Sequence, residues 1–182
     1  MIDRAGSTAI KVACVCAAAA LGFILFESTA RALETTASLW ALHHLGAHAA
    51  FGIAPTTVLI VPRHHAAFDV LITPSCSSLA SLLAFGCLAP LTPWRPPTRR
   101  VLSFGMAAVV IAIGNVLRIA ASIAVGLVAG RASLVLFHDW VGSMFTFVYT
   151  LGGFILMLTL LLPRSAGPHV AARSAPVVLR AA

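Results

Sequence analysis

The sequence predicts an all-α integral membrane protein with about four transmembrane helices and both termini in the cytoplasm. Of its 182 residues, 60% are hydrophobic and only 9% are charged, and the mean hydropathy is +1.00. Soluble domains carry about 25% charged residues. Because so few polar side chains cannot cover a soluble surface, we expect the apolar segments to face lipid.

Four apolar segments approach the roughly 20 helical residues that a bilayer requires. They cover residues 9–27, 75–94, 101–130 and 138–162. The first also has the basic flank of a signal peptide. No small-residue cleavage site leads from it into a soluble domain, so we expect a retained helix.

The positions of the basic residues set the expected orientation, because cytoplasmic segments carry an excess of Lys and Arg. With the N-terminus inside, the cytoplasmic side holds Arg4, Lys11, Arg95, Arg99, Arg100, Arg164, Arg173 and Arg180, and the outer side holds Arg31, Arg63 and Arg131. The net charge of +7 does not indicate nucleic-acid binding, because these residues form no basic stripe with interleaved aromatics.

The expected organisation has four parts: a first transmembrane helix at 1–30, an extracytoplasmic loop at 31–74, a three-helix core at 75–162 and a disordered cytoplasmic tail at 163–182. Within the loop, apolar residues at helical spacing over 31–52 predict an interfacial helix. After it, "TTVLIV" and "AAFDVLIT" flank the turn-like "PRHH" and predict a short hairpin.

Three reactive side chains are expected to meet at the outer face of the membrane. Arg118 lies about 27 Å along a helix from Arg100, and Cys76 lies about 28 Å from Arg95, whereas the hydrocarbon core is about 30 Å thick. His138 begins the last apolar segment from the outer side. Three spans would therefore bring a thiol, a guanidinium and an imidazole to one level.

Cys76 differs from the other cysteines because it follows Thr73-Pro74-Ser75, a sequence typical of a helix start. In a first helical turn, the positive end of the helix would lower the pKa of the thiol. The bland alternative is a small apolar residue in a membrane helix. Cys14, Cys16 and Cys87 have no such setting and are assigned no role.

Arg118 and His138 each have a structural and a chemical interpretation. An arginine inside an apolar run either reaches up to the headgroups or serves a polar site in the bundle. Asn115 shares its helical face, which favours a polar site that holds a carbonyl or stabilises an oxyanion. His138 is either an interfacial histidine or a general acid and base. Asp139 is poorly placed to orient it, because adjacent helix positions point about 100° apart.

The remaining histidines do not indicate a metal centre. His43, His44 and His48 lie near one another, and His64 and His65 follow in the hairpin turn. No carboxylate or further ligand spacing accompanies them, and no cysteine pair has metal-ligand spacing. We therefore expect neither a metal nor another cofactor.

Three segments resemble the signature regions of the exosortase/archaeosortase family, in a short bacterial form. They are "SCSSL" at 75–79, "NVLRI" at 115–119 and "FHDWVG" at 137–142, and the resemblance covers about residues 55–160. It implies a nucleophile at Cys76, the family arginine at Arg118, a general acid and base at His138 and a supporting polar residue at Asn115. The family usually has glycine where this chain has Ser78, so a serine there either narrows the site or marks a divergent subgroup.

The resemblance implies a membrane-embedded cysteine protease or transpeptidase of the bacterial cell membrane, acting on the extracytoplasmic side. Its partners would be exported proteins with a C-terminal tail of motif, transmembrane helix and basic cluster, and an acceptor that is a membrane lipid or another envelope component. The thioester formed on Cys76 would pass to that acceptor or to water. The alternatives are a non-catalytic membrane scaffold and a transporter component with an anion site at Arg118; the lack of an internal repeat disfavours the transporter.

Overall fold

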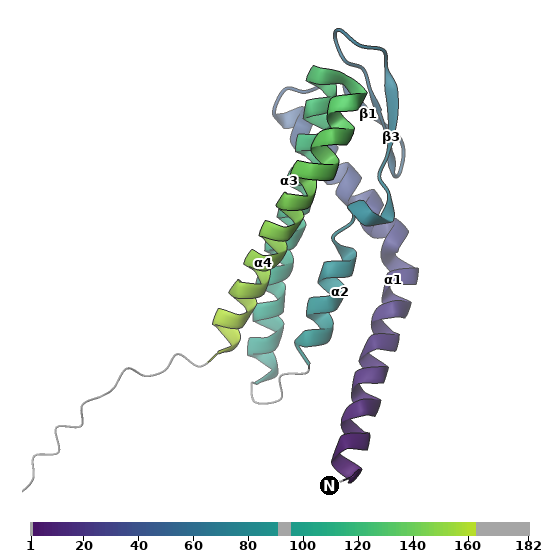
Figure 1. The fold of residues 1–182 in the computed structure, drawn as a ribbon. Coiled ribbons are helices and arrows are strands. Elements are labelled where there is room, and N and C mark those ends of the chain that lie inside the picture. The colour runs from purple at the N-terminus through teal and green to yellow at the C-terminus, as the bar shows by residue number, and fades with distance from the viewer. Residues whose placement is uncertain (1, 91–95, 163–182) are drawn as a thin grey trace, which may run out of the picture.

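The computed structural model of the protein describes residues 2–90 and 96–162, with side chains from residue 9 onward. It is mostly helical and carries a small antiparallel sheet at one end (Figure 1). The helical class is therefore correct, with the sheet as an addition to an all-α bundle. The elements are α1 (Ile2–His44), β1 (Ala50–Ala54), β2 (Thr57–Ile60), β3 (Phe68–Leu71), the 3₁₀ turn η1 (Pro74–Cys76), α2 (Leu79–Leu88), α3 (Pro97–Leu136), the π-helical turn η2 (Phe137–Val141) and α4 (Gly142–Leu161).

Helix α1 runs without interruption for 43 residues. The separate interfacial helix expected at 31–52 is not observed, because its first part is the end of α1. No Gly or Pro occurs between Gly22 and Gly46, so nothing in the sequence breaks the helix earlier. Gly46 then adopts φ +84°, and the N–H of Ala47 bonds back to the carbonyl of Leu42, which ends the helix.

The predicted hairpin is confirmed by β2 and β3, which pair antiparallel from Thr57 opposite Leu71 to Ile60 opposite Phe68. A third strand, β1, pairs with the other side of β2 and was not predicted. The inner face of the sheet packs on α3 through a cluster of buried residues that includes Ala50, Val58, Ile60, Ile119 and Ile123. This packing holds the end of β3 directly above η1.

Helices α3 and α4 form a tight antiparallel pair (Figure 1). The chain reverses at Gly130, whose φ of +78° lies in the region that favours glycine. Further down the pair, Gly114 lets the two helices approach closely, since a Cβ there would lie 2.5 Å from Cγ of Tyr149. The reversal places the residues that follow Gly130 beside the last turns before it.

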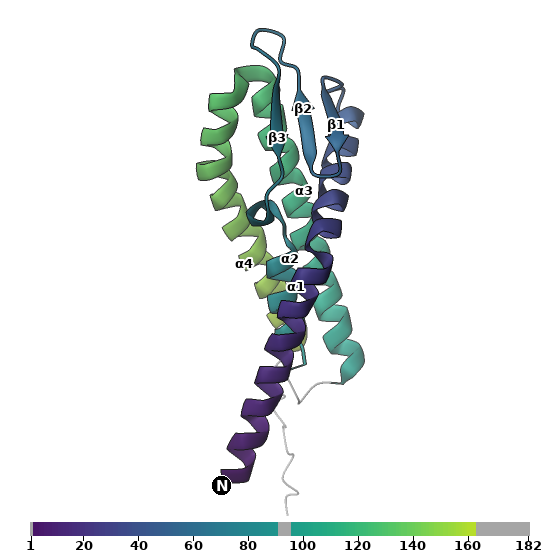
Figure 2. The same cartoon turned by 90° about the vertical axis from the view of Figure 1, so that its right-hand side faces the viewer.

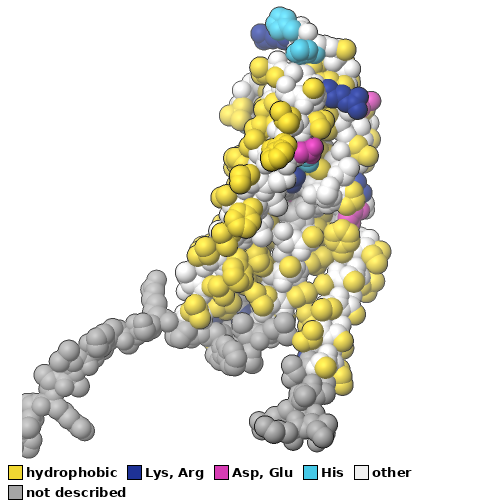
Figure 3. All heavy atoms as spheres, in the orientation of Figure 1, with side chains coloured by type: hydrophobic (Ala, Val, Ile, Leu, Met, Phe, Trp, Pro, Cys, Tyr) yellow, Lys and Arg dark blue, Asp and Glu magenta, His cyan; other side chains and the backbone are white. Residues whose placement is uncertain are grey.

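Two helical stretches are long and apolar enough to cross a membrane: Ala9–His44 and Pro97–Leu161, of which the second includes the reversal. Helix α2 has only ten residues, fewer than the roughly 20 needed for a span. Figure 3 shows hydrophobic side chains over much of the visible length of the helices, with Arg and His side chains at the end that carries the sheet. The expected tail at 163–182 and the flank at 91–95 lie outside the described residues.

Candidate active site

Cys76 ends the one-turn helix η1, which connects β3 to α2. The prediction that it begins a membrane-spanning helix is wrong, because α2 begins only at Leu79. Ser77 has extended backbone angles (φ −84°, ψ 143°) and separates the two helices. The surroundings of the thiol are therefore set by neighbouring side chains rather than by the N-terminus of a long helix.

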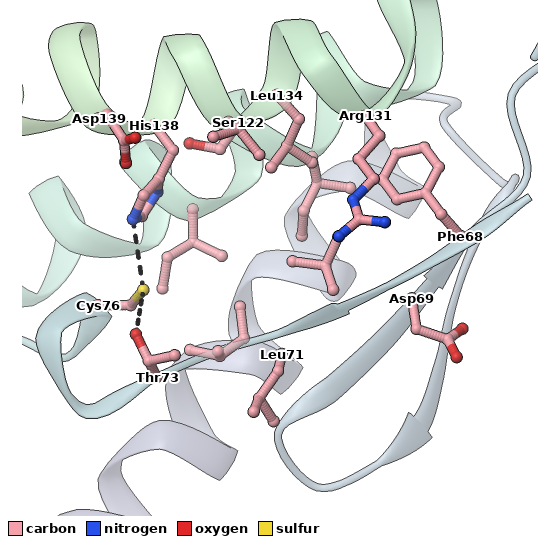
Figure 4. Close-up of a pocket in the computed structure, with 15 residues that line it drawn as sticks. Phe68, Asp69, Leu71, Thr73, Cys76, Ser122, Arg131, Leu134, His138 and Asp139 are labelled. Atoms are coloured by element: carbon pink, nitrogen blue, oxygen red, sulfur yellow. Dashed lines mark hydrogen bonds between the residues drawn. The ribbon is translucent and has the colours of Figure 1, made fainter.

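The thiol of Cys76 lies between two polar partners. Its Sγ is 3.5 Å from Nε2 of His138 and 3.2 Å from Oγ1 of Thr73 (Figure 4). Thr73 precedes the same turn, whereas His138 comes from η2, 62 residues further along the chain. A π-helical turn holds one more residue than an α-helical turn, and such turns are frequent at functional sites. The structure thus brings two of the three predicted reactive residues into contact.

The third predicted residue, Arg118, is buried in the same cluster at only 6% exposure. Its Nη2 is 3.3 Å from Nε2 of His138, and its Nη1 donates to Oδ1 of Asn115 at 3.4 Å. The alternative in which Arg118 extends up to the headgroups is therefore excluded. A Cβ on Gly142 would lie 3.1 Å from Nε of Arg118, so the glycine leaves the room that the guanidinium occupies.

Asn115 is fully buried and connects three elements. Its Nδ2 donates to the backbone carbonyl of Cys76 at 2.9 Å, and its Oδ1 accepts a hydrogen bond from the hydroxyl of Tyr149 at 3.1 Å. Sequence reasoning did not single out Tyr149. It is the only tyrosine of the chain and lies within an apolar helix, where a buried hydroxyl needs a partner. A single tyrosine in an apolar helix was therefore the sequence feature that could have indicated a buried polar contact.

Ser78 does not narrow the site. Its side chain points to α1, where its Oγ donates to Oε1 of Glu34 at 2.5 Å and its backbone N–H donates to the same oxygen at 2.9 Å. Both residues are buried. The serine therefore anchors the start of α2 to α1. The role of Glu34 was not predicted, because the two residues are 44 positions apart in the chain.

The pKa of Cys76 is lowered from 9.0 to about 7. Burial raises it, and this effect is outweighed by hydrogen bonds from the side chains of His138 and Thr73, by the charge of His138 and by a backbone hydrogen bond at Thr73. Near neutral pH a substantial fraction of the thiol is therefore ionised, which is the form that reacts as a nucleophile.

A cavity of about 250 Å³ opens beside the thiol. It lies between β3 and the helical residues that follow Gly130 (Figure 4), and its lining consists of residues 68–73, Cys76, Ile119, Ser122, Ile123, Arg131, Leu134, Val135, His138 and Asp139. Asp139 is exposed, and no hydrogen bond joins its carboxylate to His138 in the described part of the chain. The site is thus a thiol and an imidazole at one end of a mainly apolar cavity.

The other candidate residues stay apart from this cluster. His43 bonds to the carbonyl of Ala50 and His44 to that of Trp40. Within residues 2–90 and 96–162, no three His, Cys, Asp or Glu side chains are grouped to hold a metal ion. Cys14 and Cys16 are exposed on α1, and Sγ of Cys87 lies 3.8 Å from the carbonyl of Val15.

The comparisons with known proteins add no relative. No family model, no curated protein and no solved structure matches the chain.

Proposed function

We propose that the protein is a membrane-embedded cysteine peptidase or transpeptidase that removes the C-terminal sorting tail of exported proteins. The observation that carries this proposal is the contact of a buried thiol with an imidazole, Sγ of Cys76 to Nε2 of His138 at 3.5 Å, beside the buried guanidinium of Arg118. Acyl transfer uses a nucleophile next to a base, together with a group that stabilises negative charge. Here the thiol of Cys76 and the guanidinium of Arg118 both lie next to Nε2 of His138.

In the proposed reaction, Nε2 of His138 takes the proton of the thiol, and the thiolate of Cys76 attacks the carbonyl carbon of the scissile peptide bond. The C–N bond then breaks, and His138 returns the proton to the leaving amine, which leaves a thioester on Cys76. An amine of an envelope acceptor or a water molecule attacks the thioester, and the thiol is released. The lowered pKa of Cys76 supports this role for the thiol.

Arg118 is the group best placed to stabilise the oxyanion. The backbone N–H groups of residues 76–79 are engaged: those of Cys76 and Ser77 bond to the carbonyls of Thr73 and Pro74, that of Ser78 to Glu34 and that of Leu79 to the hydroxyl of Ser77. Arg118 has a buried Nε without a partner among the described residues. Protonated His138 can no longer accept a hydrogen bond from Nη2, so ionising the thiol also frees an N–H of Arg118.

The proposed setting is the bacterial cell membrane, with about four spans, cytoplasmic termini and the thiol on the extracytoplasmic side. The two long apolar stretches, of which the second reverses at Gly130, support three of these spans; the fourth is assigned to α2, which is shorter than a full span. Arg and His side chains gather at the sheet end, where an aqueous face is expected (Figure 3). A substrate whose C-terminal helix crosses the same membrane would present the residues just outside that helix to Cys76.

The test compares Cys76→Ala, Arg118→Ala and His138→Ala in a host that lacks the wild-type copy. Each variant should leave membrane proteins with uncleaved C-terminal tails, with losses of roughly 10²–10³-fold for the oxyanion donor and 10²–10⁴-fold for the base. Cys87→Ala is the matched control and should process tails normally. Normal processing by Cys76→Ala at an equal protein level would refute the proposal.

A non-catalytic scaffold is the second candidate, favoured by the hydrogen bonds that tie η1, α3 and α4 together through Asn115. The same variants separate the two functions. A scaffold would tolerate Cys76→Ala, and it would lose protein level rather than activity in Arg118→Ala.

A further inference from the structure

Strand β3 lies at one edge of the sheet, because the strand order is β1-β2-β3. Figure 2 shows that this edge faces the green helical segment that leads into α4, and not another strand. The cavity beside Cys76 extends along this edge, since residues 68–73 line it. An open strand edge thus leads directly to the thiol.

The register identifies the backbone groups that remain open. The N–H of Ile72 bonds to the carbonyl of Thr56, and this pair continues the register in which Val70 faces Val58. In an antiparallel pair, alternate residues direct both backbone groups toward the partner strand. Ile72, Val70 and Phe68 therefore bond toward β2, whereas Asp69 and Leu71 direct their N–H and C=O groups to the open edge.

The cavity next to that edge has the form of a groove. Its floor is α3, through Ile119, Ser122 and Ile123, and its second wall is the helical segment that carries Leu134 and His138. In Figure 4 this segment and β3 lie on opposite sides of the open space, with Cys76 at one end and Arg131 toward the other. A chain lying along β3 would meet apolar side chains below it and the thiol at its end.

We propose that the substrate binds by adding a strand to the edge of β3, with an extended segment paired to the backbone of Asp69 and Leu71. The proposal rests on the proposed function and specifies how that site holds its peptide. A substrate anchored in the membrane by its C-terminal helix runs toward the membrane as it approaches Cys76. Strand β3 runs toward η1 and α2 in the same direction, so the added strand is parallel to β3 (Figure 1).

Strand addition gives affinity through the main chain, and the pockets beside it select alternate side chains. Here the outward groups of Asp69 and Leu71 supply the main-chain bonds, and the apolar floor receives every second side chain of the peptide. The segment N-terminal to the scissile bond is therefore recognised in an extended conformation. A substrate that is helical up to the cleavage point would not be accepted.

The test uses the full-length protein in detergent and the reagent acetyl-Ala-Ala-Ala chloromethyl ketone. Its peptide runs in the same N-to-C direction as the substrate segment before the scissile bond, with the reactive ketone in the place of the scissile carbonyl. The thiolate of Cys76 displaces chloride and forms a thioether, which tethers the peptide. Amide hydrogen exchange, read at single residues, should then slow by at least about tenfold at Asp69 and Leu71 and stay unchanged at Phe68 and Val70. Iodoacetamide, which alkylates Cys76 without a peptide, should protect neither residue.

Reagents N-methylated at one amide at a time give a second readout. The alkylation rate should fall about tenfold at every second amide and stay near that of the parent reagent at the others. Leu71→Pro, which removes an outward N–H, should slow the peptide reagent about tenfold but not iodoacetamide. Gly52→Pro on the opposite edge strand, whose N–H also points away from β2 because the N–H of Val61 bonds to the carbonyl of Ala49, is the matched control and should slow neither reagent.

The outcomes separate the two proposals. Selective alkylation of Cys76 without protection of Asp69 and Leu71, or without alternation among the methylated reagents, would overturn strand addition and leave the nucleophile in place. Alkylation of Cys76 no faster than that of Cys14 or Cys16 would instead refute the proposed function itself.

Discussion

The side-chain amide of Asn115 donates a hydrogen bond of 2.9 Å to the backbone carbonyl of Cys76. The other end of the same amide accepts from Tyr149 and from Arg118, so one buried side chain fixes η1 to both α3 and α4. The position of the thiol therefore depends on residues that do not touch it.

Tyr149→Phe removes the hydroxyl that bonds to Asn115 and leaves the ring packing in place. The loss of one buried hydrogen bond should cost about 1 kcal/mol of stability. Tail processing should slow several-fold, because Asn115 is then free to turn away from Cys76. The unfolding temperature in detergent and the processing rate in cells measure the two effects. A variant equal to wild type in both would show that Tyr149 does not position Asn115.

Gly142→Ala tests whether the guanidinium of Arg118 must occupy its present place. The new methyl group would lie 3.1 Å from Nε, so Arg118 has to shift by a few tenths of an ångström. We expect processing to fall about tenfold or more, because preorganised charge is sensitive to position. Gly152→Ala on the same helix is the matched control, because within the described residues its added Cβ meets no other side chain or neighbouring element within 4 Å. Equal rates for the two variants would contradict this placement of Arg118.

The pH dependence of alkylation reports the ionisation of Cys76. Only the thiolate reacts, so the rate with iodoacetamide should rise with pH below about 7, where the thiol is protonated, and level off above it. In His138→Ala the hydrogen bond and charge that lower the pKa are lost, while burial still raises it. The midpoint should therefore move well above 7. An unchanged midpoint in His138→Ala would show that the histidine does not act on the thiol.

Glu34 should stabilise the start of α2 as a hydrogen-bond acceptor for Ser78, and its negative charge should not be needed. Glu34→Gln keeps an amide oxygen that can accept from Ser78, whereas Glu34→Ala leaves a buried N–H and hydroxyl without their partner. The alanine variant should lose about 1–3 kcal/mol of stability, and the glutamine variant should lose clearly less. Thermal unfolding of the two variants is the measurement, and equal losses would contradict the role assigned to the Ser78 contacts.

Part of this site could be predicted, because the number of residues along a helix gives the distance of each side chain from the helix end. The rise of 1.5 Å per residue predicts that Arg118 lies level with Cys76, and the structure brings both into one cluster through Asn115 and His138. The break at Gly130 coincides with the end of an apolar run in the sequence. Asn115 followed from its position three residues earlier on the same face. The hairpin of β2 and β3 was readable because β-branched residues flank a turn.

The rest depended on tertiary contacts that the sequence does not encode locally. Cys76 ends a separate turn rather than starting a long helix, and just after that turn the backbone N–H and the hydroxyl of Ser78 both bond to Glu34, on a helix far earlier in the chain. Strand β1 is short and mostly apolar, so only its pairing with β2 distinguishes it from a loop. The apolar segment at 9–27 and the amphipathic segment at 31–52 differ in composition, so the sequence predicts two helices, whereas no helix breaker separates them and α1 is continuous.

The most direct test of the account is whether a thioester forms on Cys76 during tail removal. Hydroxylamine added to membranes containing the wild-type protein should attack that thioester, so that cleaved exported proteins end in C-terminal hydroxamates detectable by mass spectrometry. Membranes with Cys76→Ala should yield none of these products, and those with Cys87→Ala should yield them normally. Removal of the same tails by Cys76→Ala, at a wild-type level of protein, would contradict the account.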